Sequence, residues 1–392
     1  MEIAEEGANR GPLSHLRVLD FTQLLQGPLA TQMLADLGAD VVKVEKPGGE
    51  WMRHWGILAS ETSGEMDSFL AYNRNKRSVT VNLKDPDVRT ALLRTGAEFD
   101  VVVENFRPGV MARLGLGYDD FRAYNEQIIY ASSSGYGQDG PYVTRPGQDL
   151  LIQAMTGLLS LTGRAVDPPT ACGIGISDEY TGLHLVVAIL AAVSHRQATG
   201  KGQQVSVDLF SCTVAAQQQE LTVFLNHGNP LPRAAEGIGH VGATAPFGIY
   251  PTADGFLALA MTPCPVLGGV LGQEWLKEFD TNELMFRNRD AIHRKLSAFF
   301  AEDTTQHWLA VLDAADVWCG PVQTYTDLLT DPQVLHNGLI WSVPVGREGE
   351  GTFRTVGTPF RFSATPPELR MGVPRAGQHN DELLPAWGLG SG

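Results

Sequence analysis

The sequence predicts an α/β protein in which a larger domain holds a doubly wound parallel sheet and a smaller domain is of the α+β type. Three observations support this fold class. Short runs rich in valine and isoleucine alternate with segments whose apolar residues recur at helical spacing, as in consecutive βαβ units. The chain of 392 residues exceeds one ordinary domain. Its composition also changes after residue 225, where glycine, proline, histidine and asparagine become frequent.

The first βαβ unit is expected as a strand at residues 16–21, a helix at 29–37 and a strand at 40–45. Pro28 suits the first turn of that helix, and Gly38 suits its end. The same alternation continues along the larger domain. We expect its further strands at residues 78–83, 100–104, 127–132 and 204–209, and its further helices at residues 86–95, 178–198 and 213–225.

The smaller domain is expected to follow a loop at residues 226–242. Short strands are predicted within residues 246–261, and helices at 289–301 and 304–314. Strand and turn signals return at residues 337–366. We therefore assign the larger domain to residues 1–225 and about 326–392, and the smaller domain to residues 226–325.

The bulk composition excludes several classes of function. The net charge of −15 and a pI near 5.1 argue against nucleic acid or an anionic membrane as a partner. No apolar leader is visible in residues 1–11, and the four cysteines form no CxxC pair, so we expect a cytoplasmic protein without a metal site. The turn after the first strand lacks GxGxxG, which disfavours a nicotinamide or flavin site.

The most informative single residue is Asp178, in the segment GIGISDEYTG at residues 173–182. An aspartate directly before an apolar helix is typical of an N-cap, and the local sequence alone favours that interpretation. The alternative is a nucleophilic carboxylate at a helix start, next to a glycine turn that allows close backbone approach. Nearby His184 is expected to be a core histidine.

Three polar segments border predicted strands: residues 73–78 precede a strand, and residues 104–109 and 132–149 each follow one. Residues 73–78 (NRNKRS) are either a solvated face or a phosphate site, together with Lys43 and Lys46 at the end of the second strand. Residues 104–109 (ENFRPG) are either a structured loop or a ligand contact through the amide, the arginine and the phenylalanine. Residues 132–149 form a turn-rich loop that could face the same site.

Together these segments resemble the class III (CaiB/BaiF) CoA-transferases, the family of formyl-CoA transferase, carnitine CoA-transferase and α-methylacyl-CoA racemase. The resemblance covers nearly the whole chain, and the order and spacing of its segments make it specific. It runs through LRVLDFT (16–22), GP (27–28), LGADVVKVE (37–45), NKRS (75–78), ENFRPG (104–109), SGYGQDGP (134–141), the Asp178 segment, CGPV (319–322) and DPQ (331–333).

The resemblance implies a fold, a nucleophile and a set of contacts. It implies an open Rossmann-like domain plus a small domain in an interlocked homodimer, with Asp178 as the catalytic aspartate. The implied CoA contacts are Gln23, Lys46, Asn105, Phe106, Val110 and Arg113. The implied candidates for the substrate site are Gly135, Tyr136, Gln148 and Asp149. Gln23 replaces a histidine of formyl-CoA transferase, and Lys46 replaces an arginine.

The implied reaction moves CoA from an acyl-CoA to a free carboxylic acid through an aspartyl-CoA thioester on Asp178, without a bound cofactor. The cations near the site would suit a dicarboxylate. Two alternatives are kept: a 2-methylacyl-CoA racemase of the same fold, and a CoA-binding paralogue without catalysis. Racemases carry a histidine where this chain has Gln148, which cannot serve as the base.

Overall fold

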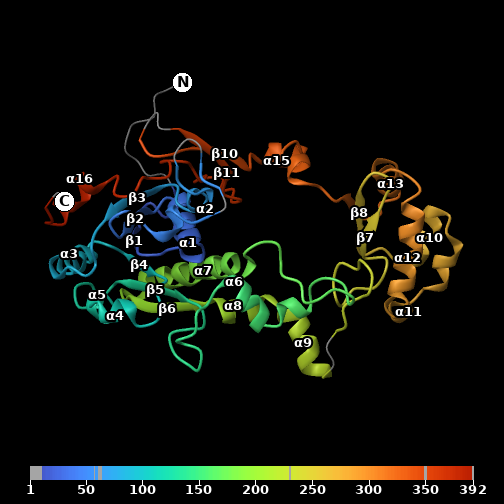
Figure 1. Cartoon of the computed structure of the whole chain (residues 1–392), viewed down its shortest axis with the longest axis horizontal. Coiled ribbons are helices and arrows are strands. Elements are labelled where there is room, and N and C mark those ends of the chain that lie inside the picture. Colours follow the sequence, from blue (N-terminus) through green and yellow to red (C-terminus); the bar gives the residue numbers. More distant parts are fainter. Residues whose placement is uncertain (1–10, 57, 61–63, 229–230, 348–350, 391–392) are drawn as a thin grey trace. The chain divides into compact units, whose positions relative to one another are not determined.

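In the computed structural model, residues 11–390 are described except 57, 61–63, 229–230 and 348–350. The stretch 1–11 considered for a leader therefore lies almost entirely outside the described residues. Helices and strands along the chain are shown in Figure 1.

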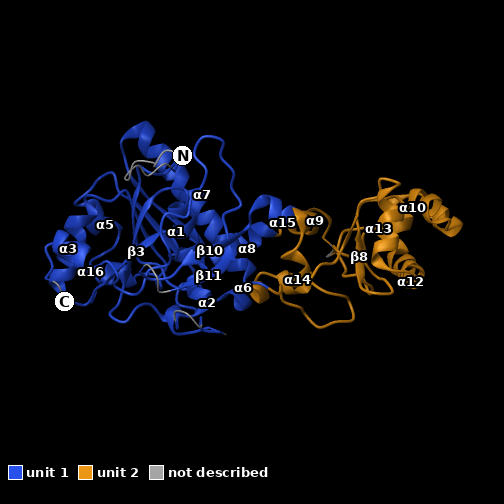
Figure 2. Cartoon of the chain, turned by 90° about the horizontal axis from the view of Figure 1, so that it is seen from above, with its two compact units in different colours: residues 1–152, 174–216, 333–392 blue, residues 153–173, 217–332 orange. Residues whose placement is uncertain are grey.

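The chain folds into two compact units, shown in different colours in Figure 2. The first unit takes in the described parts of residues 1–152, 174–216 and 333–392, and the second takes in those of 153–173 and 217–332.

These units differ from the expected domains mainly in the segment 153–173 and in residues 217–225, which join the second unit. Hydrogen bonds within that unit give the reason. Gln217 Nε2 donates to the Thr156 carbonyl at 3.2 Å, which ties the start of one segment to the other. Interactions of this kind leave no periodic signal in the sequence.

The first unit is built on a six-stranded sheet in the order β3-β2-β1-β4-β5-β6, in which every neighbouring pair is parallel. This is the doubly wound order of Rossmann folds, with the change of direction between β1 and β4. The α/β fold expected from the sequence is therefore confirmed. The strands are β1 (Arg17–Asp20), β2 (Asp40–Glu45), β3 (Lys76–Thr80), β4 (Val101–Glu104), β5 (Ile129–Ser134) and β6 (Gln203–Asp208).

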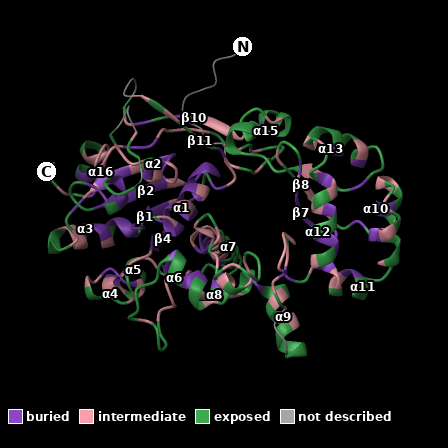
Figure 3. Ribbon diagram, turned by 45° about the vertical axis from the view of Figure 1, so that its right-hand side comes forward, coloured by how far each residue is buried: buried purple, intermediate pink, exposed green. Residues whose placement is uncertain are grey.

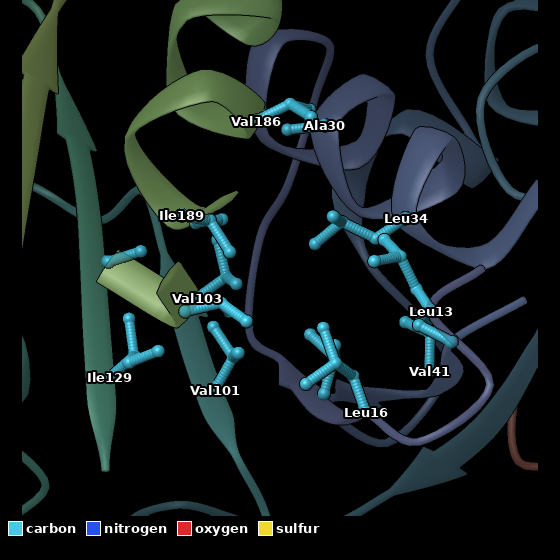
Figure 4. Close-up of a cluster of buried hydrophobic side chains, with 14 of the residues drawn as sticks. Leu13, Leu16, Ala30, Leu34, Val41, Val101, Val103, Ile129, Val186 and Ile189 are labelled. Carbon is cyan, nitrogen blue, oxygen red and sulfur yellow. The ribbon is translucent and has the colours of Figure 1, made fainter. Parts of the chain in front are cut away.

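Helices cover both faces of this sheet. One face packs on α1 (Gln26–Asp36) and α7 (Ile176–Thr199), whose Ala30, Leu34, Val186 and Ile189 lie toward strand residues such as Val103 (Figure 4). The opposite face packs on α3 (Pro86–Gly96), α4 (Val110–Arg113), α5 (Tyr118–Arg122) and α16 (Asn380–Ala386). Residues of the central strands β1, β2 and β4 are buried on both faces, which explains the apolar runs in these strands (Figure 3).

Gly182 sets how closely α1 and α7 approach. A Cβ at this position would lie 2.8 Å from the Gln26 carbonyl oxygen and 2.9 Å from a Leu29 methyl carbon. The absent side chain therefore allows the start of α7 to lie against the start of α1. This contact holds the first turn of α7, which carries Asp178, in a fixed place over the sheet.

The remaining elements of the first unit are short. They include a two-stranded antiparallel ribbon formed by the last two strands of the chain. In order they are α2 (Asp67–Leu70), α6 (Asp149–Met155, which runs into the second unit), α8 (Leu209–Ala216), α15 (Pro332–Asn337), β10 (Ile340–Pro344) and β11 (Thr352–Val356).

The second unit combines an antiparallel sheet in the order β7-β8-β9 with a helical layer and its own apolar core, which includes Tyr250, Leu296 and Phe300. Its α+β character matches the expected smaller domain. Its elements are α9 (Gln218–His227), β7 (Gly248–Pro251), β8 (Phe256–Leu259), α10 (Cys264–Leu271), α11 (Asn282–Arg287), α12 (Arg289–Phe300), α13 (Thr305–Asp313), β9 (Cys319–Pro321) and α14 (Tyr325–Leu328).

Within the described residues, α7 is the one helix whose length and composition would let it cross a membrane. The core helix of a soluble protein meets the same criterion, and Leu185 and Ile189 of α7 are fully buried against the sheet. The interlocked dimer implied by the resemblance stays a prediction, because the structure describes one chain.

Candidate active site

A pocket of about 290 Å³ opens in the first unit at the carboxyl ends of the central strands. Its walls come from the loops after β1, β4 and β5 and from the first turn of α7. Ligands bind at this edge of open α/β sheets, beside the point where the strand order reverses. The lining residues are Leu24, Gln26, Asn105, Phe106, Arg107, Pro108, Ser134, Gly135, Tyr136, Val143, Arg145, Pro146, Gly147, Gln148, Asp178 and Leu209.

Asp178 lines this pocket as the third residue of α7, and it is not the helix cap. The N-cap is Gly175, so the N-cap interpretation favoured by the local sequence is wrong. The carboxylate that serves the helix start comes from elsewhere in the chain: Asp149 Oδ1 accepts from the Ser177 backbone N–H at 2.8 Å. Within the described residues, no hydrogen bond engages the Asp178 carboxylate.

The electrostatic surroundings of Asp178 make its carboxylate unusually basic. Burial, together with the negative charges of Asp149 and Glu179, raises the pKa of Asp178 to about 7. A basic carboxylate is a better nucleophile once it is ionised, and at neutral pH about half of the molecules carry it in that form. The helix N-terminus favours negative charge at this place.

The acid limb of the pH–rate profile should therefore reflect the ionisation of the Asp178 carboxyl group. We expect kcat/KM to fall about tenfold per pH unit below pH 7, since the attacking form is the carboxylate. Asp149→Asn keeps an oxygen acceptor for the Ser177 N–H but removes a negative charge, so the midpoint should move to lower pH. A profile that stays in place in this variant would contradict the assignment.

Asp149→Ala serves as the contrast, because it removes the acceptor as well as the charge. It should add a loss of stability of about 1 kcal/mol, as expected when a helix cap is deleted. The comparison separates the charge of Asp149 from its hydrogen bond.

Two glycines of the pocket lining, Gly135 and Gly147, bring two backbone segments together. A Cβ on Gly135 would lie 2.7 Å from the Gly147 Cα, so the two backbone segments touch directly. Tyr136 and Gln148, next to them, line the pocket with Asp178. Three of the four expected substrate-site residues thus lie at the pocket. The fourth, Asp149, is buried behind it.

Asn105 lines the pocket, but its amide is engaged with the backbone of the loop after β1. Asn105 Oδ1 accepts from the Gln23 N–H at 2.8 Å, and Asn105 Nδ2 donates to the Gln23 carbonyl at 2.7 Å. This reciprocal pair fixes the two loops to each other. Gln23 itself does not line the pocket, and its role toward CoA stays a prediction, as does that of Asn105.

The next residue of this loop, Leu24, is held in an unusual conformation. Its φ of 68° lies in the left-handed region, which a leucine rarely adopts. Its N–H donates to Glu50 Oε2 at 2.9 Å, and Glu50 is paired with Lys43 at 2.8 Å. Lys43 Nζ also donates to the Thr22 carbonyl at 2.8 Å. A buried ion pair therefore positions the part of the loop that borders the pocket.

Both interpretations of the basic segment at residues 73–78 are wrong, because each of its three cations, Arg77 included, pairs with a carboxylate of the same unit. Arg74 pairs with Asp36 at 2.6 Å, and Lys76 pairs with Asp20 at 3.2 Å. Both cations are almost fully buried. Burial lowers the pKa of Lys76 to about 8. These side chains stabilise the sheet and leave no charge for a phosphate.

Of the other expected CoA contacts, one lies at the pocket. Phe106 lines it, whereas Lys46, Val110 and Arg113 lie outside its lining. Lys46 and Arg113 are exposed, and their role toward CoA stays a prediction. His184 is half-buried, with Nδ1 2.8 Å from the Tyr180 carbonyl oxygen, so it is not the core histidine that the sequence suggested.

Sequence reasoning missed Glu50 and the capping role of Asp149. Nothing in the local pattern marks either residue, since each acts on a backbone N–H far away in the sequence, at Leu24 and Ser177 respectively.

Within the described residues, no group of three His, Cys, Asp or Glu side chains gathers as a metal site would require.

Comparison with known proteins agrees with this arrangement. The sequence pattern of CoA-transferase family III matches residues 13–380. The chain is 38% identical to an acyl-CoA transferase of Fusarium pseudograminearum, over 97% of this chain and 86% of that protein. It is 36% identical to the succinyl-CoA:glutarate CoA-transferase of Mus musculus, over 95% of this chain and 86% of that protein.

A solved structure gives the same result. The crystal structure of a CaiB/BaiF family protein from Brucella suis superposes with a TM-score of 0.85 at 33% identity, covering 96% of this chain and all of that one. A parallel sheet with a carboxylate-bearing pocket at its switch point, together with these relatives, defines the class as CoA-transferases. The chain belongs to CoA-transferase family III, the CaiB/BaiF family.

Proposed function

We propose that this enzyme transfers CoA from an acyl-CoA donor to a free carboxylic acid through covalent intermediates on Asp178. The observation that carries the proposal is the state of the Asp178 carboxylate. It lines the pocket and has a raised pKa, while Asp149 serves the helix start in its place. A carboxylate that is free of structural hydrogen bonds is suited to attack a carbonyl carbon.

The first half-reaction exchanges the acyl group for CoA on the enzyme. A carboxylate oxygen of Asp178 attacks the thioester carbonyl carbon, the C–S bond breaks, and CoA leaves as a thiolate with the bonding pair. The product is a mixed anhydride between Asp178 and the donor acid. The thiolate then attacks the Asp178 carbonyl carbon, which releases the donor as a carboxylate and leaves an aspartyl-CoA thioester.

The second half-reaction repeats these steps with the acceptor. The acceptor carboxylate attacks the aspartyl thioester and expels the CoA thiolate, which forms a second mixed anhydride. The thiolate attacks the acceptor carbonyl, the C–O bond on the acceptor side breaks, and the Asp178 carboxylate is restored. Each step exchanges one acyl bond for another without oxidation, reduction or net proton transfer.

The pocket offers electrostatic support for these steps. Each tetrahedral intermediate carries an extra negative charge on an oxygen near the first turn of α7, where the helix N-terminus is partially positive. Keeping the intermediates away from water matters as well, because anhydrides hydrolyse. Gly135 and Gly147, which both line the pocket, touch through their backbones and leave no room for a side chain between them.

We further propose that the acid is a small dicarboxylate. The mouse relative is named for a succinyl donor and a glutarate acceptor, both of which are dicarboxylates. A pocket of about 290 Å³ suits an acyl chain of that size better than a long fatty chain.

Oxygen labelling tests the proposed path. After a single turnover with acceptor acid labelled with ¹⁸O in its carboxylate, one label should appear in the Asp178 side chain, because the second anhydride breaks on the acceptor side. Peptide mass spectrometry locates the label. Hydroxylamine added during turnover should convert Asp178 to its hydroxamate. A protein that transfers CoA with no label and no hydroxamate at Asp178 would overturn the proposal.

A further inference from the structure

The usual phosphate site of a doubly wound sheet is closed in this protein. In such folds the backbone N–H groups of the turn after β1 bind a diphosphate. Here these groups are already occupied: the Thr22 N–H donates to Asp20 Oδ1 at 2.8 Å, and the Gln23 and Leu24 N–H groups donate to Asn105 and Glu50. An anionic group of the substrate must therefore be bound by other donors.

Most cations of the first βαβ units are unavailable for the same reason. Lys43, Arg53, Arg74 and Lys76 are buried in ion pairs with carboxylates of the same unit. None of them lines the Asp178 pocket. The segment at residues 73–78, which looks most basic in the sequence, contributes nothing to an anion at this site.

Two arginines that line the Asp178 pocket are different. Arg107, in the loop after β4, and Arg145, in the loop after β5, are both exposed. Within the part of the chain that the structure describes, neither guanidinium forms an ion pair or a hydrogen bond. Arg145 lies over the Tyr142 ring at 4.4 Å, and Tyr142 packs edge-on against Tyr136 with ring centroids 5.6 Å apart. Aromatic packing thus orients Arg145 at the pocket.

We propose that Arg107 and Arg145 form an anion-recognition pair that binds a substrate oxyanion remote from the reacting carbonyl. The inference rests on the proposed function. The lining of the pocket carries two guanidinium groups against one carboxylate, Asp178, whose raised pKa leaves it partly neutral. Planar guanidinium groups bind carboxylates and phosphates through paired N–H donors, and they lose little in doing so when they have no competing partner.

Two parts of the substrate present this chemistry. One is the distal carboxylate of a dicarboxylic acid, which is present in the donor acyl group and in the acceptor alike. The other is the phosphate groups of CoA, which stay bound through both half-reactions. A shared oxyanion site would serve both halves of the cycle, because it holds the substrate while Asp178 changes its acyl partner.

The test uses Arg107→Gln and Arg145→Gln in the full-length enzyme, with Arg122→Gln as the matched control. Arg122 is also an exposed arginine over a tyrosine ring, 5.9 Å from the centroid of Tyr118, but it lies outside the pocket lining. Each pocket variant should lower kcat/KM by about tenfold to a hundredfold, as expected for a lost charge-assisted hydrogen bond. Arg107→Lys and Arg145→Lys should recover part of the lost kcat/KM.

Two pairs of substrates identify the source of the oxyanion. Glutarate is compared with valerate, which lacks the distal carboxylate, and a CoA thioester is compared with the matching pantetheine thioester, which lacks phosphates. If kcat/KM of the variants falls with glutarate but not with valerate, the pair binds the distal carboxylate. If kcat/KM falls with the CoA thioester but not with the pantetheine thioester, the pair binds the phosphates of CoA. If both variants match Arg122→Gln with all four substrates, the inference is overturned.

Failure of the inference can be told apart from failure of the proposed function. If the wild-type protein transfers CoA and only the arginine variants behave like the control, the proposed function stands and the pair has no role. If the wild-type protein transfers no CoA, the proposed function fails. Calorimetric binding of CoA and of glutarate to the wild type and the two glutamine variants then still decides whether the arginines bind an oxyanion.

Discussion

Replacing Asp178 by asparagine is expected to lower the rate of CoA transfer by about 10,000-fold or more, as for the loss of other covalent nucleophiles. The amide has nearly the same shape as the carboxylate but cannot attack a thioester carbonyl. Steady-state rates measured with a dicarboxylyl-CoA donor and a free dicarboxylic acid give the comparison. Residual transfer above about one-hundredth of the wild-type rate would contradict a nucleophilic role for Asp178.

The variant should fold normally, and its stability provides a second readout. Burial raises the pKa of Asp178 to about 7, so the folded state favours the protonated form. This stabilisation is fully present below the unfolded pKa of about 3.8 and is lost as pH rises through about 7. Asp178→Asn cannot ionise, so its melting temperature relative to wild type should rise between pH 5 and pH 8.

Glu179→Gln is the matched control for this experiment. Glu179 is adjacent in the same turn of α7, but its Oε1 accepts from the Tyr72 hydroxyl at 2.7 Å and it does not line the pocket. Its charge helps to raise the pKa of Asp178. We expect this variant to keep its activity within a few-fold of wild type, with the acid limb of the pH profile moved to lower pH.

The sequence predicted the central strands of the sheet well, because strands buried on both faces produce apolar runs that differ from the helical segments between them. β2 lies at the predicted residues 40–45. The helix expected at residues 213–225 is instead two helices, α8 and α9, which meet near Gln217. That residue begins the part of the chain that packs in the second unit, and local periodicity does not record such a change of partner.

The pocket was also predictable in part, because loops after neighbouring parallel strands meet at one edge of the sheet. Asn105, Phe106, Gly135, Tyr136 and Gln148 line it with Asp178. The sequence could not show which polar atoms were already engaged inside the protein. The sequence around a lysine or an aspartate does not differ between a side chain that contacts a ligand and one that pairs with a buried partner. For that reason both interpretations of residues 73–78 were wrong, and the local sequence around Asp178 favoured a capping role that Asp149 provides instead.

The largest expected loss of stability comes from breaking the buried ion pair between Lys43 and Glu50, which positions the loop that carries Leu24. We expect Lys43→Met to lower the free energy of unfolding by about 3–5 kcal/mol, because it leaves Glu50 charged and unpaired in a dry environment. Lys43 and Glu50 are 0% and 2% exposed. Burial lowers the pKa of Lys43, but attraction to Glu50 and Asp20 outweighs it, so the lysine stays charged with a pKa above its usual value. Denaturant unfolding measures the loss.

A surface pair in the same unit provides the control. Glu98 pairs with Arg17 at 3.0 Å, but its side chain is 68% exposed. Glu98→Gln should therefore cost less than about 1 kcal/mol. If Lys43→Met costs no more than this variant, the buried pair does not hold the loop.

The double variant Lys43→Met/Glu50→Leu separates the stability of the fold from the geometry of the pocket. Two apolar side chains in place of a buried ion pair should recover much of the lost stability. The Leu24 N–H, however, then lacks the carboxylate that it donates to at 2.9 Å, and the left-handed conformation of Leu24 loses its support. We therefore expect the double variant to be stable but to have a higher KM than the wild type. Recovery of stability and KM together would mean that Glu50 stabilises the fold without positioning the pocket.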